Sequence, residues 1–250
     1  MKVEYHLSTI ASKKYHQQLR DLVAREEIQK ICDIGGGANP LLSIDEVQKY
    51  GLDYTLLDIS SEQLAKASDK YKKLQADITD PKLCLNEEYD LVCSKFLGEH
   101  VSSGLIFHKN ALNLLRDGGY AFHFFPTLYN LPFITNLILD EKISEPILLF
   151  FQPNRKKEGN HGKFKAYYDW CRGPTSENIE RFTELGYSVE EYTGFFGHGF
   201  YKRKKALVIL ALLEGVKSQL LLKYPIPLLT QFAHVLLKKH SNKTDNQVDA

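Results

Sequence analysis

The stretch ICDIGGGANPL, residues 31–41, decides the fold. An apolar run ends in Asp33 and is followed by three glycines and then, after Ala38 and Asn39, by Pro40. Glycines between a strand and a helix let the backbone come close to a ligand and point N–H groups at it. Many nucleotide-binding folds use such a turn, so the residues around it must identify the ligand.

The chain on both sides of this turn alternates apolar runs with helical patterns, which is typical of βαβ units and a mostly parallel sheet. Strands are predicted at 29–34, 53–58, 72–76, 89–94 and 118–125. Helices are predicted at 7–26, 40–50, 60–70 and 103–115. Pro40 suits the first turn of the second helix, and Ser60 or Ser61 suits the N-cap of the third.

The pattern changes after Phe125. Residues 126–172 carry four prolines and no clean period, so we expect an insertion that covers a site. A regular helical pattern follows, with Thr175 or Ser176 as its N-cap and Gly186 at its end.

The end of the chain completes the sheet. A strand at 187–195 and a very apolar helix at 201–222 lead to a last strand at 228–239, which we expect to insert antiparallel beside 187–195. The predicted fold is a single Rossmann-like α/β domain, residues 1–240, with a seven-stranded sheet. The polar tail, 241–250, is predicted to be disordered.

Composition narrows the classes of partner. The 32 basic and 31 acidic side chains nearly cancel, so no global field attracts nucleic acid, and none is expected as a partner. Four separated cysteines indicate neither a disulfide framework nor a zinc site and favour the cytoplasm. The start of the chain is too polar for a signal peptide, and no apolar run approaches the ~20 residues of a spanning helix.

Two familiar phosphate-binding patterns do not fit the glycine turn. A dinucleotide turn prefers a glycine where this chain has Pro40, and no Gly-Lys-Ser or Gly-Lys-Thr follows for a triphosphate. Asp33 would repel a phosphate but would suit an ammonium group. Asp58, about 20 residues past the glycines, is placed to accept hydrogen bonds from ribose hydroxyls. Asp77 is placed to accept from an adenine amino group, so the pattern indicates an adenosine with a cationic amino-acid tail.

Five motifs follow one another in order: ICDIGGGANPL, YTLLDIS, QADITD, YDLVCSKFLGEHV and LLRDGGYAFHFF. Over residues 28–126 they resemble the successive motifs of class I S-adenosylmethionine-dependent methyltransferases. The resemblance implies that Asp33 and the glycines contact the methionine part, that Asp58 binds the ribose, and that Ser94 lies beside the sulfonium. The expected cofactor-binding residues are Asp33, Gly35, Gly36, Gly37, Asp58, Ile59, Asp77, Ile78 and Ser94. A plainer interpretation is that the three acids only cap the helices that follow their strands.

Two histidines are candidate general bases. His198 lies between glycines just after the strand at 187–195, and His100 belongs to the Glu-His pair of GEHV, which resembles a motif of ubiquinone-type O-methyltransferases. Weaker candidates are Tyr129, His161, Tyr167 and Asp169. Some relatives of this motif hold a metal through a further Glu, but this chain has Phe96 there, so no metal is expected.

The predicted reaction moves a methyl group from S-adenosylmethionine to an oxygen, or less favourably a nitrogen or carbon, of a small-molecule, glycan or lipid-type acceptor. A nicotinamide-dependent oxidoreductase is one alternative, although it leaves Asp33 and Asp77 without a role. A non-catalytic binding protein on the same scaffold is another. The basic, apolar segment 201–222 is a candidate for contact with a membrane surface or with a second copy of the chain.

Overall fold

An eight-stranded sheet forms the centre of this computed structural model, which describes residues 1–25, 27–85, 87–128, 165–199 and 207–241. The strand order is β1-β7-β8-β6-β5-β2-β3-β4. The strands are β1 (Lys2–Leu7), β2 (Lys30–Ile34), β3 (Asp53–Asp58), β4 (Lys72–Gln75), β5 (Tyr89–Lys95), β6 (Leu115–Pro126), β7 (Tyr187–Phe196) and β8 (Phe232–Lys239). All neighbouring strands run parallel except β8, which is antiparallel to both β6 and β7.

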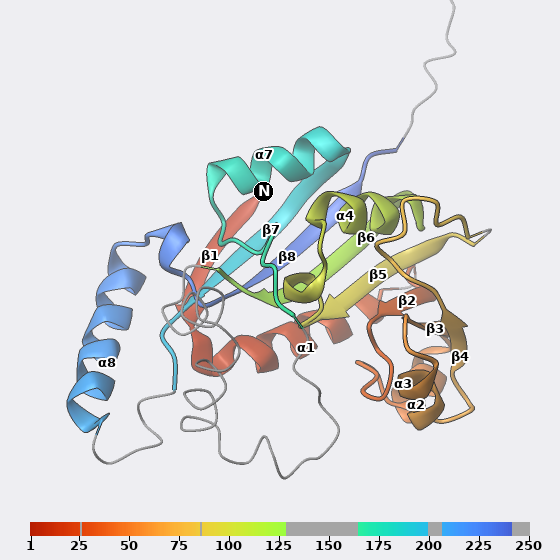
Figure 1. The fold of residues 1–250 in the computed structure, drawn as a ribbon, viewed down its shortest axis with the longest axis horizontal. Coiled ribbons are helices and arrows are strands. Elements are labelled where there is room, and N and C mark those ends of the chain that lie inside the picture. Colours follow the sequence, from red (N-terminus) through yellow and green to blue (C-terminus); the bar gives the residue numbers. More distant parts are fainter. Residues whose placement is uncertain (26, 86, 129–164, 200–206, 242–250) are drawn as a thin grey trace, which may run out of the picture.

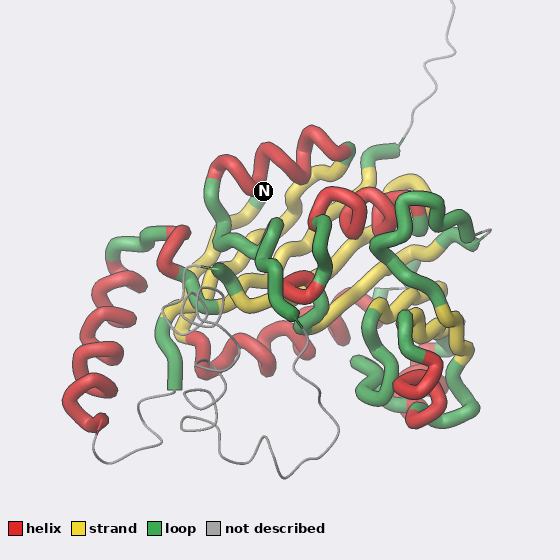
Figure 2. The backbone as a smooth tube through the Cα atoms, in the orientation of Figure 1, coloured by secondary structure: helices red, strands yellow, loops and turns green. Residues whose placement is uncertain are grey.

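Helices cover both faces of the sheet (Figures 1 and 2). The α-helices are α1 (Ala11–Val23), α2 (Ile44–Tyr50), α3 (Ser61–Lys66), α4 (Gly104–Asn113), α7 (Ser176–Leu185) and α8 (Val208–Lys223). Short 3₁₀ turns are η1 (Ser8–Ile10), η2 (Gly98–His100) and η6 (Pro227–Leu229). One core cluster joins α4 and α7 to the sheet, and a second joins α1 and the α2–α3 region to its other face.

The predicted Rossmann-like α/β class is confirmed, and the sheet has one strand more than the seven predicted. The difference is β1, which pairs in parallel with β7 along the sheet edge, from Lys2 beside Glu191 to Leu7 beside Phe196. An edge strand of this kind is only half buried, so its sequence, KVEYHL, lacks a strong apolar signal. The predicted helix at 7–26 accordingly starts later, at Ala11.

The last strand was predicted correctly in direction. β8 lies antiparallel beside β7, and it also pairs with β6. It begins at Phe232 rather than at 228, because Pro227 opens the 3₁₀ turn η6. Most of the predicted insertion at 126–172, residues 201–206 of the predicted apolar helix, and all of the predicted tail beyond Ser241 lie outside the described residues.

Local capping sets where the helices begin and end. Ser60 caps α3 and Thr175 caps α7 through their hydroxyls, and Gly186 ends α7 in the left-handed conformation, as the sequence predicts. Before α2, Ser43 and Glu46 form a capping box in which each side chain meets the other residue's backbone N–H.

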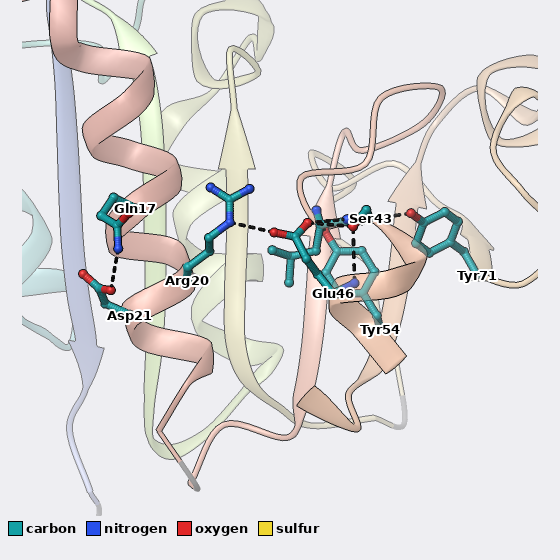
Figure 3. Close-up of polar contacts among 8 residues, drawn as sticks. Gln17, Arg20, Asp21, Ser43, Glu46, Tyr54 and Tyr71 are labelled. Carbon is teal, nitrogen blue, oxygen red and sulfur yellow. Dashed lines mark hydrogen bonds and ion pairs between the residues drawn. The ribbon is translucent and has the colours of Figure 1, made fainter. Parts of the chain in front are cut away.

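Polar contacts fix α2 and the segment before it (Figure 3). Arg20 of α1 donates from Nε to Glu46 Oε1 at 2.6 Å, so the Glu46 carboxylate joins α1 to the capping box of α2. Tyr71 donates its hydroxyl to the carbonyl of Leu42 at 2.9 Å. These contacts hold residues 42–46, directly after the glycine turn, against α1 on one side and against Tyr71, between α3 and β4, on the other. The turn is therefore supported from outside before any ligand binds.

Candidate active site

A cavity of about 420 Å³ opens at the carboxyl ends of β2, β3, β4 and β5. Ligands of open α/β sheets bind at this edge, where the segments after parallel strands meet. The first part of the wall follows β2, β3 and β4 and consists of Ile34, Gly35, Ala38, Asn39, Leu57, Asp58, Ile59, Ser60, Gln63, Ala76, Asp77, Ile78 and Thr79. The second part follows β5 and consists of Phe96, Leu97, His100, Val101, Ser102 and, from far along the chain, Tyr167.

The glycine turn is packed so closely that side chains are excluded. Gly35 has φ +75°, which favours glycine, and its N–H donates to the Leu57 carbonyl at 2.7 Å. A β carbon on residue 36 would lie 2.6 Å from Asp33 Oδ2, and one on residue 37 would lie 2.5 Å from Asp58 Oδ2. The glycines thus make room for two carboxylates as well as for a ligand, although of the three only Gly35 lines the cavity.

Asp33 lies beneath the turn and does not line the cavity. Its Oδ2 accepts hydrogen bonds from the Leu41 N–H at 2.9 Å and from the Tyr54 hydroxyl at 2.7 Å. Burial raises the pKa of this carboxyl to about 7, and the two hydrogen bonds only partly offset that effect. The side chain therefore joins the two ends of the glycine turn from below.

Asp58 stands at the end of β3 and faces the cavity. Its Oδ1 accepts the backbone N–H of Ser60 at 2.9 Å, which fixes the carboxylate just before α3. This contact uses one oxygen and leaves the capping of α3 to the Ser60 hydroxyl, while Oδ2 lies beside Gly37. The same side chain can fix the turn before α3 and still offer an acceptor to a ligand.

Asp77 and Ile78 follow β4 and line the same cavity, together with Ile59. Asp77 Oδ1 accepts from the Thr79 N–H at 2.8 Å and from the Thr79 hydroxyl at 2.7 Å. Ile78 is buried, and its carbonyl accepts from the Asn110 side chain at 2.7 Å. Ile59, in contrast, is 63% exposed, so a ligand could cover it.

Phe96 occupies a strained position directly after β5. Its φ is +55°, a left-handed value that non-glycine residues rarely adopt. Its N–H donates to the Phe124 carbonyl at 2.8 Å, and its ring packs against the Phe124 ring with centroids 4.6 Å apart. The conformation keeps a large ring 42% exposed at the cavity wall. Such strain at a site is a common sign of function.

His100 lines the cavity, and the neighbouring Glu99 is buried behind it. His100 Nδ1 lies 3.0 Å from the carbonyl of Lys165. Burial raises the pKa of the Glu99 carboxyl to about 8. The Glu99 carbonyl accepts the N–H of Tyr167 at 2.7 Å, so η2 is tied to the chain that returns from the segment 129–164.

Besides Asp33, Gly36 and Gly37, two more of the expected site residues, Ser94 and His198, lie outside the cavity wall. Ser94 is buried in β5, where its hydroxyl lies 2.8 Å from His123 Nδ1. His198, just after β7, has Nε2 at 3.4 Å from Glu214 Oε2 of α8. Burial lowers the pKa of the His198 imidazole, although Glu214 acts in the opposite direction.

Of the weaker candidates, some line the cavity and others do not. Tyr167 lines the cavity, whereas Asp169 accepts the N–H of Gly104 at 2.8 Å at the start of α4. Tyr129 and His161 lie outside the described residues. Across the described ranges, no group of three or more His, Cys, Asp or Glu side chains is arranged to hold a metal ion.

The segment after the strand predicted at 89–94 was expected to border the site, but only His100 was singled out in it. Phe96, Leu97, Val101 and Ser102 gave no catalytic signal, because apolar and hydroxyl residues after a strand are common. Their position after β5, the strand next to β2 in the sheet, is the feature that brings them to the site. Gln63 was hidden for another reason: it lies inside α3, and only the packing of α3 against the turn brings it to the site.

Comparisons with known proteins agree with this geometry. The family described as "Methyltransferase domain" matches residues 7–207. No curated protein sequence matches significantly. Among solved structures, an S-adenosylmethionine-dependent methyltransferase from Clostridium acetobutylicum is 13% identical, with 92% of each chain covered and a TM-score of 0.55.

Two further structures have the same fold. A methyltransferase from Archaeoglobus fulgidus is 14% identical over 91% of this chain and 94% of its own, with a TM-score of 0.51. Phosphoethanolamine N-methyltransferase 2 of Haemonchus contortus, in complex with S-adenosyl-L-methionine, is 16% identical over 92% of this chain and 53% of its own, with a TM-score of 0.54. At such identities the likeness concerns the fold, whereas the family match extends over most of the sequence. The chain therefore belongs to the methyltransferase domain family.

Proposed function

We propose that the protein transfers a methyl group from S-adenosylmethionine to an oxygen atom of an acceptor bound between Phe96, His100 and Tyr167. Membership of the family gives the reaction class and the methyl donor, and it decides against a nicotinamide-dependent oxidoreductase. The acceptor belongs to the small-molecule, glycan or lipid-type classes, and nitrogen or carbon is a less favoured target. The observation that carries the proposal is one cavity with carboxylates on its first part and an aromatic, histidine-containing wall on its second.

The first part of the cavity fits the methyl donor. Its volume of about 420 Å³ falls in the range of roughly 300–1,000 Å³ of small-molecule sites. Asp58 would accept from the ribose hydroxyls, with Oδ2 in the space that a side chain at position 37 would fill. Asp77 would accept from the adenine amino group, and Ile59 and Ile78 would cover the base. When bound, S-adenosylmethionine supplies an electrophilic methyl group on a sulfonium centre.

Asp33 is proposed to act on the glycine turn rather than to touch the ligand closely. Its hydrogen bonds to Leu41 and Tyr54 hold the turn in the shape that leaves Gly35 at the cavity. Gly36 and Gly37 would serve that shape through their lack of a β carbon. Ser94 would act in a similar way, since its hydroxyl pairs with His123 behind the cavity wall. Both residues would affect affinity by positioning the backbone.

His100 is the better supported base. A carbonyl can only accept a hydrogen bond, so the contact with Lys165 favours the tautomer with the proton on Nδ1. In that tautomer Nε2, which lies 3.8 Å from Glu99 Oε1, carries the lone pair that can take a proton from a hydroxyl acceptor. His198 remains the second candidate, although its contact with Glu214 directs it toward α8.

The experiment offers S-adenosylmethionine with matched panels of hydroxylated and amine acceptors and detects methylated products by mass spectrometry. We expect hydroxylated acceptors to react. His100→Gln should lower kcat by about 100-fold or more, the usual scale for a general base, without changing the affinity for S-adenosylhomocysteine. His240→Gln, at an exposed position, is the matched control. Methylation of amines alone would contradict the oxygen acceptor, and a loss confined to His198→Gln would move the base to His198.

The same experiment also tests the non-catalytic alternative. If the protein binds S-adenosylhomocysteine but methylates nothing in either panel, a binding role on a methyltransferase scaffold becomes the better explanation.

A further inference from the structure

Helix α8 differs from an ordinary surface helix. Its polar residues Glu214 and Ser218 face the domain, whereas most of its large aliphatic residues face outward. Its buried residues are Glu214, Ser218 and Leu221, and Ala211 lies partly buried in line with them. These four positions repeat at the three- and four-residue spacing of one helix face. An ordinary surface helix would place its apolar residues on that face.

The inner face is held by specific polar contacts. Glu214 Oε2 lies 3.4 Å from His198 Nε2 and accepts from Lys217 Nζ at 2.7 Å. Ser218 packs against Gly197, where a β carbon would lie 2.5 Å from the Ser218 hydroxyl oxygen. Turning α8 to bury its aliphatic residues would pull Glu214 and Ser218 away from these partners. The outward direction of the aliphatic face is thus fixed by the fold.

The outer face consists of large aliphatic side chains on the side of the helix opposite Glu214 and Ser218. They are Ile209, Leu212, Leu213, Val216 and Leu220, with exposed fractions from 56% to 68%. The apolar surface continues beyond the helix through Tyr224, Ile226, Leu228 and Leu229. A contiguous exposed apolar patch of this kind marks an interaction site, whereas single exposed residues do not.

The position of α8 leaves this face accessible. The helix contacts β1 and β7 at the edge of the sheet, and Figure 1 shows it at one end of the molecule, beyond that edge and away from α4 and α7. The helix has 16 residues, fewer than the ~20 needed to span a bilayer. Within the described residues, no helix is long and apolar enough to cross a membrane. A helix of this kind would have to lie along a surface.

Charge distinguishes between the partners that such a face could meet. Between residues 201 and 231 the sequence has six basic side chains, at 202–205, 217 and 223, and one acid, Glu214. The acid is buried and paired with Lys217, so Lys223 and the basic positions 202–205, which lie outside the described residues, leave this stretch of sequence with an excess of positive charge. We propose that the outer face of α8 binds the surface of a membrane that contains anionic phospholipids, with its aliphatic side chains among the acyl chains and its lysines at the headgroups.

A second copy of the chain fits the same face less well. A two-fold contact through α8 would place identical patches against each other, and the excess of basic residues in the sequence 201–231 would then oppose the contact. An anionic lipid surface satisfies both the apolar side chains and the charge. This inference does not depend on the proposed acceptor, because it concerns a surface outside the cavity.

Vesicle sedimentation tests the proposal. The full chain should sediment with vesicles of dioleoylphosphatidylglycerol, much less with vesicles of dioleoylphosphatidylcholine, and less at high salt. The variant Leu212→Gln/Val216→Gln/Leu220→Gln should weaken binding by about tenfold or more. Leu105→Gln, an exposed leucine on α4, is the matched control and should bind normally. Retained affinity for S-adenosylhomocysteine shows that each variant is folded. Equal binding by the triple variant, or no binding by the native chain, would overturn the proposal.

Cysteine labelling distinguishes a lipid surface from a protein partner. In a Cys84→Ser background, which removes the exposed native thiol, Leu213→Cys should react quickly with a maleimide in solution and slowly on phosphatidylglycerol vesicles. Leu105→Cys should react quickly in both conditions. Slow labelling of Leu213→Cys without vesicles would mean that another part of the chain or a second copy covers α8, and this result would also overturn the proposal.

Discussion

The carboxylate of Asp58 occupies the space that a side chain on residue 37 would need, since Oδ2 lies 2.5 Å from the position of a β carbon there. The glycine after β2 and the acid that ends β3 therefore form one unit, although 20 residues of chain lie between them. Pairing of β2 with β3 in register, Ile34 beside Leu57, brings them together.

Gly37→Ala should displace the Asp58 carboxylate or the Gln63 side chain, which lies 2.9 Å from the same β-carbon position. We expect the affinity for S-adenosylhomocysteine, measured by calorimetry, to fall by about tenfold or more, equal to at least ~1.4 kcal/mol. Gly215→Ala is the matched control, because a β carbon there meets nothing within 4 Å. Unchanged affinity in Gly37→Ala would show that the two residues do not act together.

Asp58→Ala should weaken S-adenosylhomocysteine binding by roughly 10- to 150-fold, since a hydrogen bond to a charged group contributes about 1.5–3 kcal/mol. Asp53→Ala removes an exposed acid at the other end of the same strand and should leave binding unchanged. Equal affinities of the two variants would remove Asp58 from the cofactor site.

Two substitutions of Phe96 separate the backbone strain at this position from the role of its ring. Phe96→Ala keeps a β carbon in the left-handed conformation, whereas Phe96→Gly relieves it. By urea denaturation, Phe96→Gly should be more stable than Phe96→Ala by about 1 kcal/mol. Both should retain S-adenosylhomocysteine binding and lose turnover of the acceptor, because both remove the ring. A loss of cofactor affinity instead would place Phe96 at the cofactor.

The buried carboxyl group of Glu99 should make the stability of the protein depend on pH. Its pKa is raised from the usual 4.5 to about 8 by burial, so the folded state holds a proton that the unfolded state releases. The stability linked to this proton is complete below about pH 4.5 and is lost as the pH rises to about 8. Relative to native protein, Glu99→Gln should therefore gain free energy of unfolding across this window, by more than about 1 kcal/mol. Glu88→Gln, at an exposed position, should show no such trend; a flat difference for Glu99→Gln would contradict the buried proton.

The part of the site built from strand ends was predictable from sequence. Asp58 and Asp77 each stand at the end of a predicted strand, and parallel strands bring such ends to one edge, so the sequence predicts both at one ligand. Asp33 shows the limit of that reasoning. It has the same sequence context, but its position beneath the glycines depends on where Tyr54 and Leu41 lie.

The second part of the cavity wall, where we propose that the acceptor binds, was only partly predictable. Phe96 and Tyr167 lie 71 positions apart and meet at the cavity only because the chain returns beside η2. The two histidines illustrate the same point, because both follow strands at the correct edge. His100 faces the cavity, whereas His198 meets a glutamate on a helix whose polar side could be identified only from its packing.

The edge strand β1 has a consequence for how this chain folds during synthesis. Lys2 pairs beside Glu191, so β1 cannot pair until the chain has been made as far as β7. β7 in turn is flanked on its other side by β8, which is translated later still. Until β7 has been made, the residues of β1 have no strand to pair with.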